Sequence, residues 1–285
     1  MPLTIHGMNT GVIRHNNQFI ALALKIKHDK KKENLLFFPL LSLKDLLLSI
    51  EQRLHMKSLL SDSARKNFDK ATESAEKKLQ QNAPVMIEEE LKNADVRQRV
   101  ERVTLTHNAA DSVTLELSLN GGDTVTLLIN DTQMRLLVNV IILAMNNAGL
   151  RAILDSVSSI LDFLPLYDVD CKDKGQLEFD TYQHPEWKHA LFNYYLTLVY
   201  LYKNEQGEEQ ACGTVIKTRT PSNSKEAQSI AKRLLRYSNR LRKLENIPCK
   251  VLVRTLVADK PVTLTQDQCL HAVHNLRHQS EQSAA

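Results

Sequence analysis

The chain has few of the residues and none of the short motifs that mark several familiar enzyme classes. Only eight of its 285 residues are glycine, and none forms a phosphate-binding Walker loop or a dinucleotide fingerprint. The GxSxG elbow, the HExxH zinc motif and the kinase signature set are also missing. The four cysteines are widely spaced without a CxxC pair, which predicts separate reduced thiols. No motif indicates a reaction, and we expect no cofactor.

Long apolar runs are missing as well. The longest candidates, residues 35–50 and 136–145, are both interrupted by polar residues. Neither reaches the ~20 consecutive apolar residues that a membrane-spanning helix requires. The chain does not open with a basic segment followed by an apolar one, as a secretory signal would. We therefore expect a cytoplasmic protein that makes no membrane contact.

The chain does contain a pattern of extended segments followed by a helix, and this pattern occurs about three times. It is clearest in the middle of the chain, where residues 112–119 alternate between polar and apolar side chains. The sequence Asn120-Gly121-Gly122 then favours a tight hairpin, after which the alternation resumes. Residues 132–147 are apolar almost all round, which predicts a buried helix that ends at Gly149.

The same order of elements is predicted nearer both ends of the chain. Residues 20–26 and 35–38 precede a predicted helix at 43–55, and residues 196–202 and 211–218 precede a helix that opens near 224. We therefore predict an α+β fold of repeated antiparallel β-meanders, each followed by a helix. Because the likeness is one of pattern, both an internal duplication and a chance repetition remain open.

The predicted organisation has five segments. They are a first meander unit (1–58), a charged helical connector (59–98), a second meander unit (99–170), a hairpin unit with a basic helix (171–245), and a C-terminal strand, helix and disordered tail (246–285). The connector carries a narrow apolar stripe formed by Phe68, Ala71, Ala75 and Leu79. Such a stripe favours light packing against the body of the protein over pairing with a partner helix.

Positive charge is concentrated in the last third of the chain. Residues 216–255 contain eleven Lys and Arg against two Glu, although the whole chain carries a net charge of only +4. Cations that recur along the predicted basic helix, residues 224–244, could follow a phosphate backbone. The candidate nucleic-acid-binding residues are Lys232, Arg233, Arg236, Arg240 and Lys243, with Lys25 and Lys27 as a second contact. The alternative is a solvated face, with or without an acidic partner.

Two groups of potential metal ligands are weak. His274 and His278 lie one helical turn apart, but no carboxylate or thiol on that face completes a coordination shell. The acidic run at 168–173 resembles the start of a calcium loop, yet Lys172 stands at a ligand position and the final Glu is missing. We therefore predict no metal site.

The chain opens with the residues MPLTIHGMNTGVIRHNNQFIALALKIKHDKKKENLLFFPLLSLKDLLLSIEQRLHMK. With this opening, and in length and order over most of the chain, it resembles the YjeJ family, an uncharacterised group of enterobacterial proteins. The resemblance implies a bacterial cytoplasmic protein. It supplies no catalytic or binding residues that can be assigned to positions in this sequence.

Three functional hypotheses follow from these observations. The first is a non-enzymatic accessory or regulatory protein that acts through macromolecular contacts with a protein partner. The alternative is a nucleic-acid or other polyanion-binding protein that uses the basic helix at 224–244. The third is an enzyme whose site is assembled from scattered residues without a local motif. The sequence favours the first hypothesis and leaves the oligomeric state open.

Overall fold

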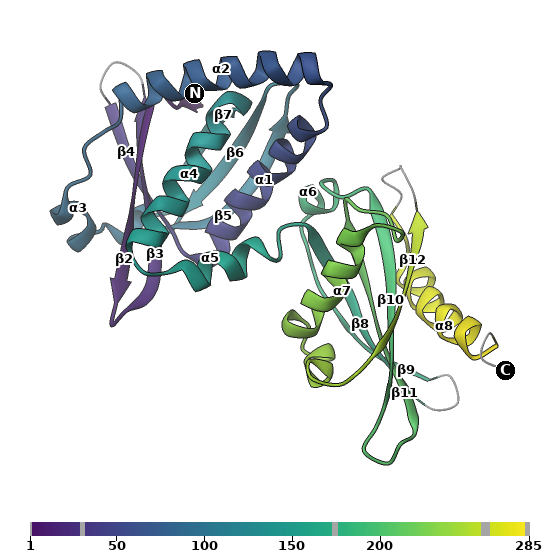
Figure 1. Cartoon of the computed structure of the whole chain (residues 1–285). Helices are drawn as coiled ribbons and strands as arrows, with labels where there is room; N and C mark the ends of the chain where they lie inside the picture. The colour runs from purple at the N-terminus through teal and green to yellow at the C-terminus, as the bar shows by residue number, and fades with distance from the viewer. Residues whose placement is uncertain (1, 29–31, 173–175, 258–262, 283–285) are drawn as a thin grey trace. The chain divides into compact units, whose positions relative to one another are not determined.

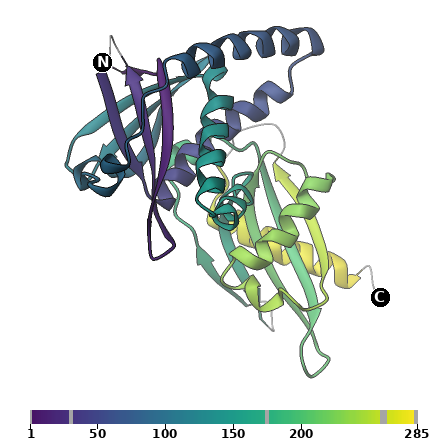
Figure 2. The same cartoon turned by 60° about the vertical axis from the view of Figure 1, so that its left-hand side comes forward.

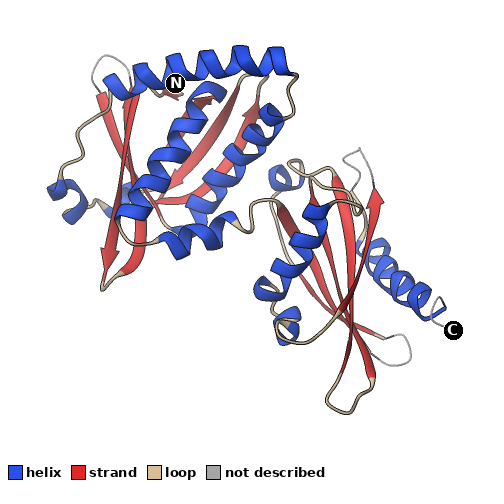
Figure 3. Ribbon diagram, in the orientation of Figure 1, coloured by secondary structure: helices blue, strands red, loops and turns tan. Residues whose placement is uncertain are grey.

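The computed structural model describes residues 2–28, 32–172, 176–257 and 263–282. The chain separates into two compact units, Met1–Leu161 (unit 1) and Asp162–Ala285 (unit 2). Both units combine helices with sheets of mostly antiparallel strands (Figure 1, Figure 3). The predicted α+β class is therefore confirmed.

Unit 1 contains two three-stranded meanders, each followed by a long helix. The first comprises β2 (Gly7–His15), β3 (Gln18–His28), β4 (Lys32–Phe38) and α1 (Leu40–Ser58). The second comprises β5 (Val100–Asn108), β6 (Ser112–Leu119), β7 (Thr124–Asn130) and α4 (Asp131–Asn147). The other elements are β1 (Leu3–Thr4), α2 (Asp62–Gln81), α3 (Glu88–Lys92), η1 (Val96–Gln98) and α5 (Arg151–Ser158). Strand β1 pairs in parallel with β7, and a parallel bridge between Phe37 and Arg99 joins the two meanders.

The second meander follows the sequence prediction closely. Gly122 has a φ of +86° in the turn between β6 and β7, a conformation that glycine adopts without steric cost. At the start of α4, the side chain of Gln133 accepts a hydrogen bond from the backbone N–H of Asn130. Gly149 follows the helix with a φ of +71°, as expected of a glycine at a helix end.

Strand β3 is buried on both faces. Leu22 and Leu24 are fully buried on the face toward the long helices, where Thr10 of the paired strand donates a hydrogen bond to the carbonyl of Val140 in α4. On the other face, Ala21, Ala23 and Phe37 form a small core with side chains around α3, namely Met86, Leu91 and Ala94. Burial on both sides accounts for the apolar Ala21 and Ala23 between the larger apolar residues of this strand.

The long helices of unit 1 are connected by ion pairs. The guanidinium of Arg53 in α1 contacts both carboxylate oxygens of Asp131 at the start of α4, at 2.9 and 2.6 Å, and both side chains are buried. The connector helix α2 packs against α4, where Glu76 binds Arg135 at 2.7 Å. Leu79 of the predicted apolar stripe is buried. The connector is therefore part of the body of unit 1.

Unit 2 is a five-stranded antiparallel sheet in the order β12-β10-β11-β8-β9. Its strands are β8 (Phe163–Cys171), β9 (Leu177–Thr181), β10 (Tyr194–Lys203), β11 (Glu209–Thr218) and β12 (Lys250–Val257). Its helices are α6 (Glu186–His189), α7 (Lys225–Tyr237), η3 (Leu241–Leu244) and α8 (Gln266–Gln282). The unit begins inside the predicted segment 99–170, and its strand β9 lies in a stretch for which the sequence predicts no strand.

Helices cover both faces of this sheet (Figure 2). On one face, the hydroxyl of Tyr200 donates to the carbonyl of Ala231 in α7 at 2.7 Å. On the other face, α8 approaches Gly213 so closely that a Cβ there would lie 2.6 Å from a methyl group of Val273. The sheet is therefore the middle layer of unit 2.

The C-terminal helix runs further than the sequence predicts. The spacing of Thr265 and Gln268 predicts a capping box at the start of this helix, and the two residues form it through hydrogen bonds of 2.9 and 3.3 Å. The sequence predicts a disordered tail over the last eight residues, from His278, but α8 continues to Gln282. Residues 283–285 lie outside the described residues.

Candidate functional site

The predicted basic helix over 224–244 is wrong in its extent. Helix α7 ends at Tyr237, and a separate short turn, η3, follows from Leu241. Ser238 makes the break, because its hydroxyl donates to Asp168 at 2.5 Å and accepts from the backbone N–H of Leu241 at 2.9 Å. Arg240 and Lys243 therefore do not continue the helical face that carries Lys232 and Arg236.

Most of the predicted nucleic-acid-binding side chains in this region make ion pairs within unit 2. Arg233 binds the two carboxylate oxygens of Asp162 at 2.8 and 2.5 Å. Arg236 contacts Glu245 at 3.2 Å, and both of these side chains are well exposed. Lys232 is exposed on α7 and makes no ion pair with any described residue.

Arg240 and Lys243 bind an acidic strip on the sheet. Arg240 contacts Asp170 at 2.8 Å and Asp180 at 2.7 Å, while Lys243 contacts Asp170 at 2.6 Å. Burial alone would raise the pKa of Asp170, but the hydrogen bonds from Lys243, Cys212 and Arg240 lower it. Asp180 is the main cause of the raised pKa of Arg240. These two cations neutralise carboxylates of their own chain.

The acidic strip consists of four side chains that the strand register places together. They are Asp168, Asp170, Glu178 and Asp180. Asp168 pairs with Asp180 and Asp170 with Glu178 across β8 and β9, so each pair shares one face. The sequence signal was the spacing of two between Asp168 and Asp170, which fits a strand better than a calcium loop. Asp173 lies outside the described residues.

Asp168 is the most deeply buried of these carboxylates. It has no exposed surface, and one of its oxygens accepts hydrogen bonds from Ser238 and from Tyr182 at 2.6 Å. Its other oxygen has no hydrogen-bond partner among the described residues. Burial, followed by the hydrogen bond to Asp168, raises the pKa of Tyr182. This network holds the α7–η3 junction on the sheet.

Cys212 lies beside the strip and is not an activated thiol. Its sulfur is 3.0 Å from Asp170 and 3.7 Å from the hydroxyl of Tyr202. Burial, followed by the hydrogen bond to Asp170, raises the pKa of Cys212 to about 12. Because the thiolate is the nucleophilic form of cysteine, this environment suppresses reactivity.

The predicted second nucleic-acid contact, Lys25 and Lys27, lies in unit 1. Lys25 is buried and Lys27 is half-buried. Lys25 is only 6% exposed and contacts Glu90 at 2.7 Å and Glu33 at 3.1 Å. Burial disfavours its charge, but the bonds to Glu90 and Glu33 outweigh burial and raise the pKa of Lys25. Lys27 is half-buried on the same strand. Lys25 thus fixes the α3 segment to β3.

The weak metal candidates are two histidines of α8 that pack against each other. The rings of His274 and His278 lie edge to face, 4.3 Å apart. Among the described residues, no group of three or more His, Cys, Asp or Glu side chains is arranged to hold a metal ion. None of the described helices is long and apolar enough to cross a membrane.

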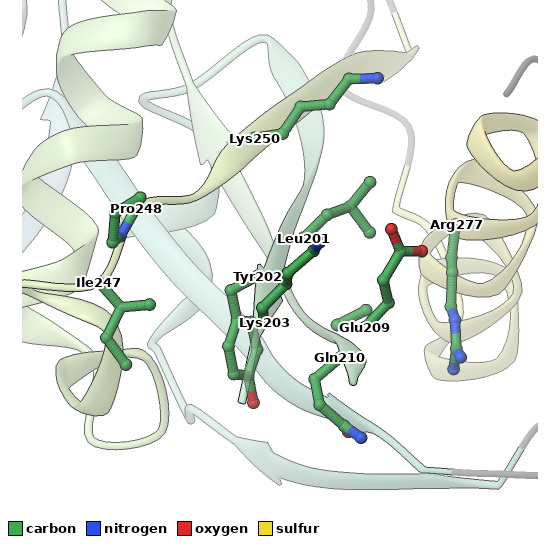
Figure 4. Close-up of a pocket in the computed structure, with 10 residues that line it drawn as sticks. Leu201, Tyr202, Lys203, Glu209, Gln210, Ile247, Pro248, Lys250 and Arg277 are labelled. Carbon is green, nitrogen blue, oxygen red and sulfur yellow. The ribbon is translucent and has the colours of Figure 1, made fainter. Parts of the chain in front are cut away.

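A half-open pocket of about 540 Å³ lies at one end of the unit 2 sheet (Figure 4). It is formed where the β10–β11 hairpin extends past the start of β12, with α8 alongside. The lining side chains are Leu201, Tyr202, Lys203, Glu209, Gln210, Ala211, Ile247, Pro248, Lys250 and Arg277. No sequence pattern predicts this pocket, because its walls come from four separate segments.

Strand β12 forms one edge of the same sheet. In the described part of unit 2 it pairs with β10 alone. The apolar side chains of Val251, Leu252, Val253 and Leu256 remain partly exposed, and Val251 reaches 37%. Lys250 and Arg254 are exposed and make no ion pair with any described residue.

Comparison with known proteins gives a family for the whole chain. The model of the YjeJ-like family matches residues 1–283. A protein of Escherichia coli strain K12, described as "Uncharacterized protein YjeJ", is 47% identical over 285 residues, which are 100% of this chain and 99% of that protein. No solved structure matches the chain. As the resemblance of its opening residues predicts, the chain belongs to the YjeJ-like family.

Proposed function

We propose that this protein is a non-enzymatic accessory or regulatory protein that binds a protein partner along the open edge of β12. The observation that carries the proposal is the position of β12 at the end of the strand order, with Lys250 and Arg254 exposed on it. An edge strand presents backbone N–H and C=O groups that a further strand can pair with. Partner proteins use such edges by adding an extended segment to the sheet.

The charge of β12 selects the kind of segment that fits. Its two cations would repel a second basic strand and attract an acidic one, and such complementarity sets partner choice and association rate. The half-buried side chains of Leu252, Val253 and Leu256 provide apolar area that the added strand would cover. We therefore assign an extended acidic segment of another protein as the occupant.

A designed peptide provides a direct test. Fluorescence anisotropy with a dye-labelled peptide of four Glu-Val repeats should detect saturable binding, and Arg254→Glu should weaken it by about tenfold or more. Lys232→Glu is the matched control, because it makes the same charge change at an exposed residue of α7 that is not part of β12. Hydrogen exchange of the β12 amides should slow when the peptide is bound.

Three outcomes would contradict the proposal. A peptide of four Lys-Val repeats could bind as tightly, Lys232→Glu could weaken binding as much as Arg254→Glu, or the β12 amides could exchange at an unchanged rate. Sedimentation velocity tests whether a second copy of the chain occupies the edge instead. A dimer that Arg254→Glu abolishes would show that it does.

The nucleic-acid alternative stays a prediction. The ion pairs of Arg240, Lys243 and Lys25 count against it, whereas exposed Lys232 is available to a phosphate. A gel shift with DNA or RNA at low salt that Lys232→Glu weakens would support it. The hypothesis of a motif-free enzyme also stays a prediction, without assigned residues.

A further inference from the structure

One face of strand β12 is apolar, and the register of the sheet shows which residues lie on it. The hydroxyl of Tyr200 in β10 donates to the carbonyl of Ala231 in α7, so Tyr200 points to the α7 face of the sheet. Val251 lies opposite Tyr200 in the antiparallel pair and therefore shares that face. Because side chains alternate along a strand, Val253 also points to the α7 face.

The two cations of β12 point to the other face. A Cβ at Gly213 of β11 would meet α8 at 2.6 Å, so this position faces α8. Gly213 lies opposite Val199 of β10, and Val199 lies opposite Leu252 of β12, which places Leu252 on the α8 face. Lys250 and Arg254, two residues to either side of Leu252, point the same way. The exposed cations of this edge therefore share one face, four positions apart.

Exposed apolar area is concentrated at the same edge. Among the described residues of unit 2, the large apolar side chains that are well exposed are Ile247 and Val251, at 38% and 37%. Ile247 and Pro248, which precede the strand, lie on the side away from Arg277 of α8 (Figure 4). The apolar area thus lies on the α7 side of the edge, and the positive charge lies on the α8 side.

Two features limit the stretch of edge that a partner strand can use. At the start of β12, Pro248 has no backbone N–H to offer a further strand. Towards the other end, the hydroxyl of Thr255 accepts a hydrogen bond from the backbone N–H of Ser222 at 2.9 Å, so the loop before α7 lies against this residue. Residues 250–254, with both cations and both valines, lie between these limits.

We propose that the partner segment carries two acidic residues four positions apart, with apolar residues at the second and fourth positions of that stretch. Paired one to one with residues 250–254, it places its carboxylates opposite Lys250 and Arg254 and its apolar side chains opposite Val251 and Val253. This pattern reads the same from either end, so it suits parallel and antiparallel pairing alike. It depends on the strand addition proposed above and specifies the occupant.

Two dye-labelled peptides of identical composition test the spacing. The first has the core Glu-Val-Thr-Val-Glu and the second has the core Val-Glu-Thr-Glu-Val, and each core is flanked by two Thr at both ends. In fluorescence anisotropy with the full chain, the first should bind about fivefold tighter or more. The second is weaker because its two Glu, only two positions apart, cannot lie opposite Lys250 and Arg254 at once.

A charge exchange tests the assignment of faces. A peptide with the core Lys-Val-Thr-Val-Glu should bind Arg254→Glu about fivefold tighter or more than it binds the wild type, because its Lys then lies opposite a carboxylate. Val251→Glu is the matched control, since it places a carboxylate on the α7 face and should give the Lys peptide no such gain. Both positions are exposed, so both variants should keep the wild-type melting temperature.

The outcomes separate this pattern from the strand addition itself. Equal binding of the two isomers, or an equal gain with Val251→Glu and Arg254→Glu, would overturn the pattern. Strand addition would still stand in that case if the peptide of four Glu-Val repeats slows exchange of the β12 amides. If none of these peptides binds at millimolar concentration, both proposals fail.

Discussion

At the scale of single residues, Lys217 places an ammonium group inside unit 2 without a carboxylate partner among the described residues. Its side chain is 3% exposed, donates to the carbonyl of His189 at 2.6 Å, and lies 4.9 Å from the centre of the Tyr195 ring. Burial lowers the pKa of Lys217 below its ordinary value of 10.5. Such a group destabilises the folded state while it is charged.

Replacing Lys217 by Met should therefore stabilise the protein at pH 7, by roughly 1 kcal/mol after the lost hydrogen bond is counted. The lowered folded pKa means that the wild type regains stability as the pH rises toward the unfolded value of 10.5. The difference in unfolding free energy between the variant and the wild type, measured by urea unfolding, should shrink over that pH range. Lys232→Met, an exposed control, should show no such trend; a variant less stable than wild type at every pH would refute the assignment.

At the scale of elements, the α7–η3 segment is held on the sheet by charges that come from distant parts of the chain. Arg240 binds Asp170 of β8 and Asp180 of β9, which precede it by 70 and 60 residues. The pair is partly exposed, with the side chain of Arg240 at 22%, so solvent screening limits its strength. These contacts hold the basic α7–η3 segment against strands β8 and β9.

Arg240→Gln should consequently destabilise unit 2 by about 1–2 kcal/mol, because charge-assisted hydrogen bonds to two carboxylates are lost. Lys232→Gln should change stability by less than about 0.5 kcal/mol, as expected of an exposed side chain without partners. Urea titration followed by circular dichroism measures both. If Arg240→Gln instead lowers retention on heparin with stability unchanged, Arg240 serves a polyanion and the structural assignment fails.

The sequence predicted those elements whose pattern lies within a few neighbouring residues. The second meander has regular alternation and the Asn-Gly-Gly turn, and both appear where expected. Strand β2 was missed, because Gly7 and Gly11 interrupt its pattern; a Cβ at Gly7 would lie 2.1 Å from the carbonyl oxygen of Asn82. The end of α7 was missed because helical periodicity continues past Ser238, and its bond to Asp168 joins residues 70 positions apart.

At the scale of the whole molecule, each unit has a core of its own. Unit 1 buries Leu22, Leu46 and Leu115 completely, and unit 2 does the same with Leu198 and Tyr200. Lengths of 161 and 124 residues suit independently folding domains. The boundary at 161 and 162 was not predicted from composition, because the serines before it, at 156, 158 and 159, alternate with apolar residues and lie at the end of α5.

Fragments 1–161 and 162–285 should each fold when expressed separately, with cooperative thermal unfolding and dispersed amide proton spectra. A matched pair cut at the predicted boundary, 1–170 and 171–285, should behave differently, because the second fragment loses β8 from the middle of its sheet. Equal folding of 171–285 and 162–285 would show that the unit boundary is drawn in the wrong place.

The lack of a side chain at Gly213 affects the position of α8 as well as its own strand, β11. Because no side chain stands between β11 and Val273, α8 lies closer to β11 than a residue with a Cβ at this position would allow. Even a methyl group at that position would act as a wedge and tilt the helix outward, carrying Arg277 with it. The absence of a side chain at Gly213 thus helps to set the width of the pocket that Arg277 lines.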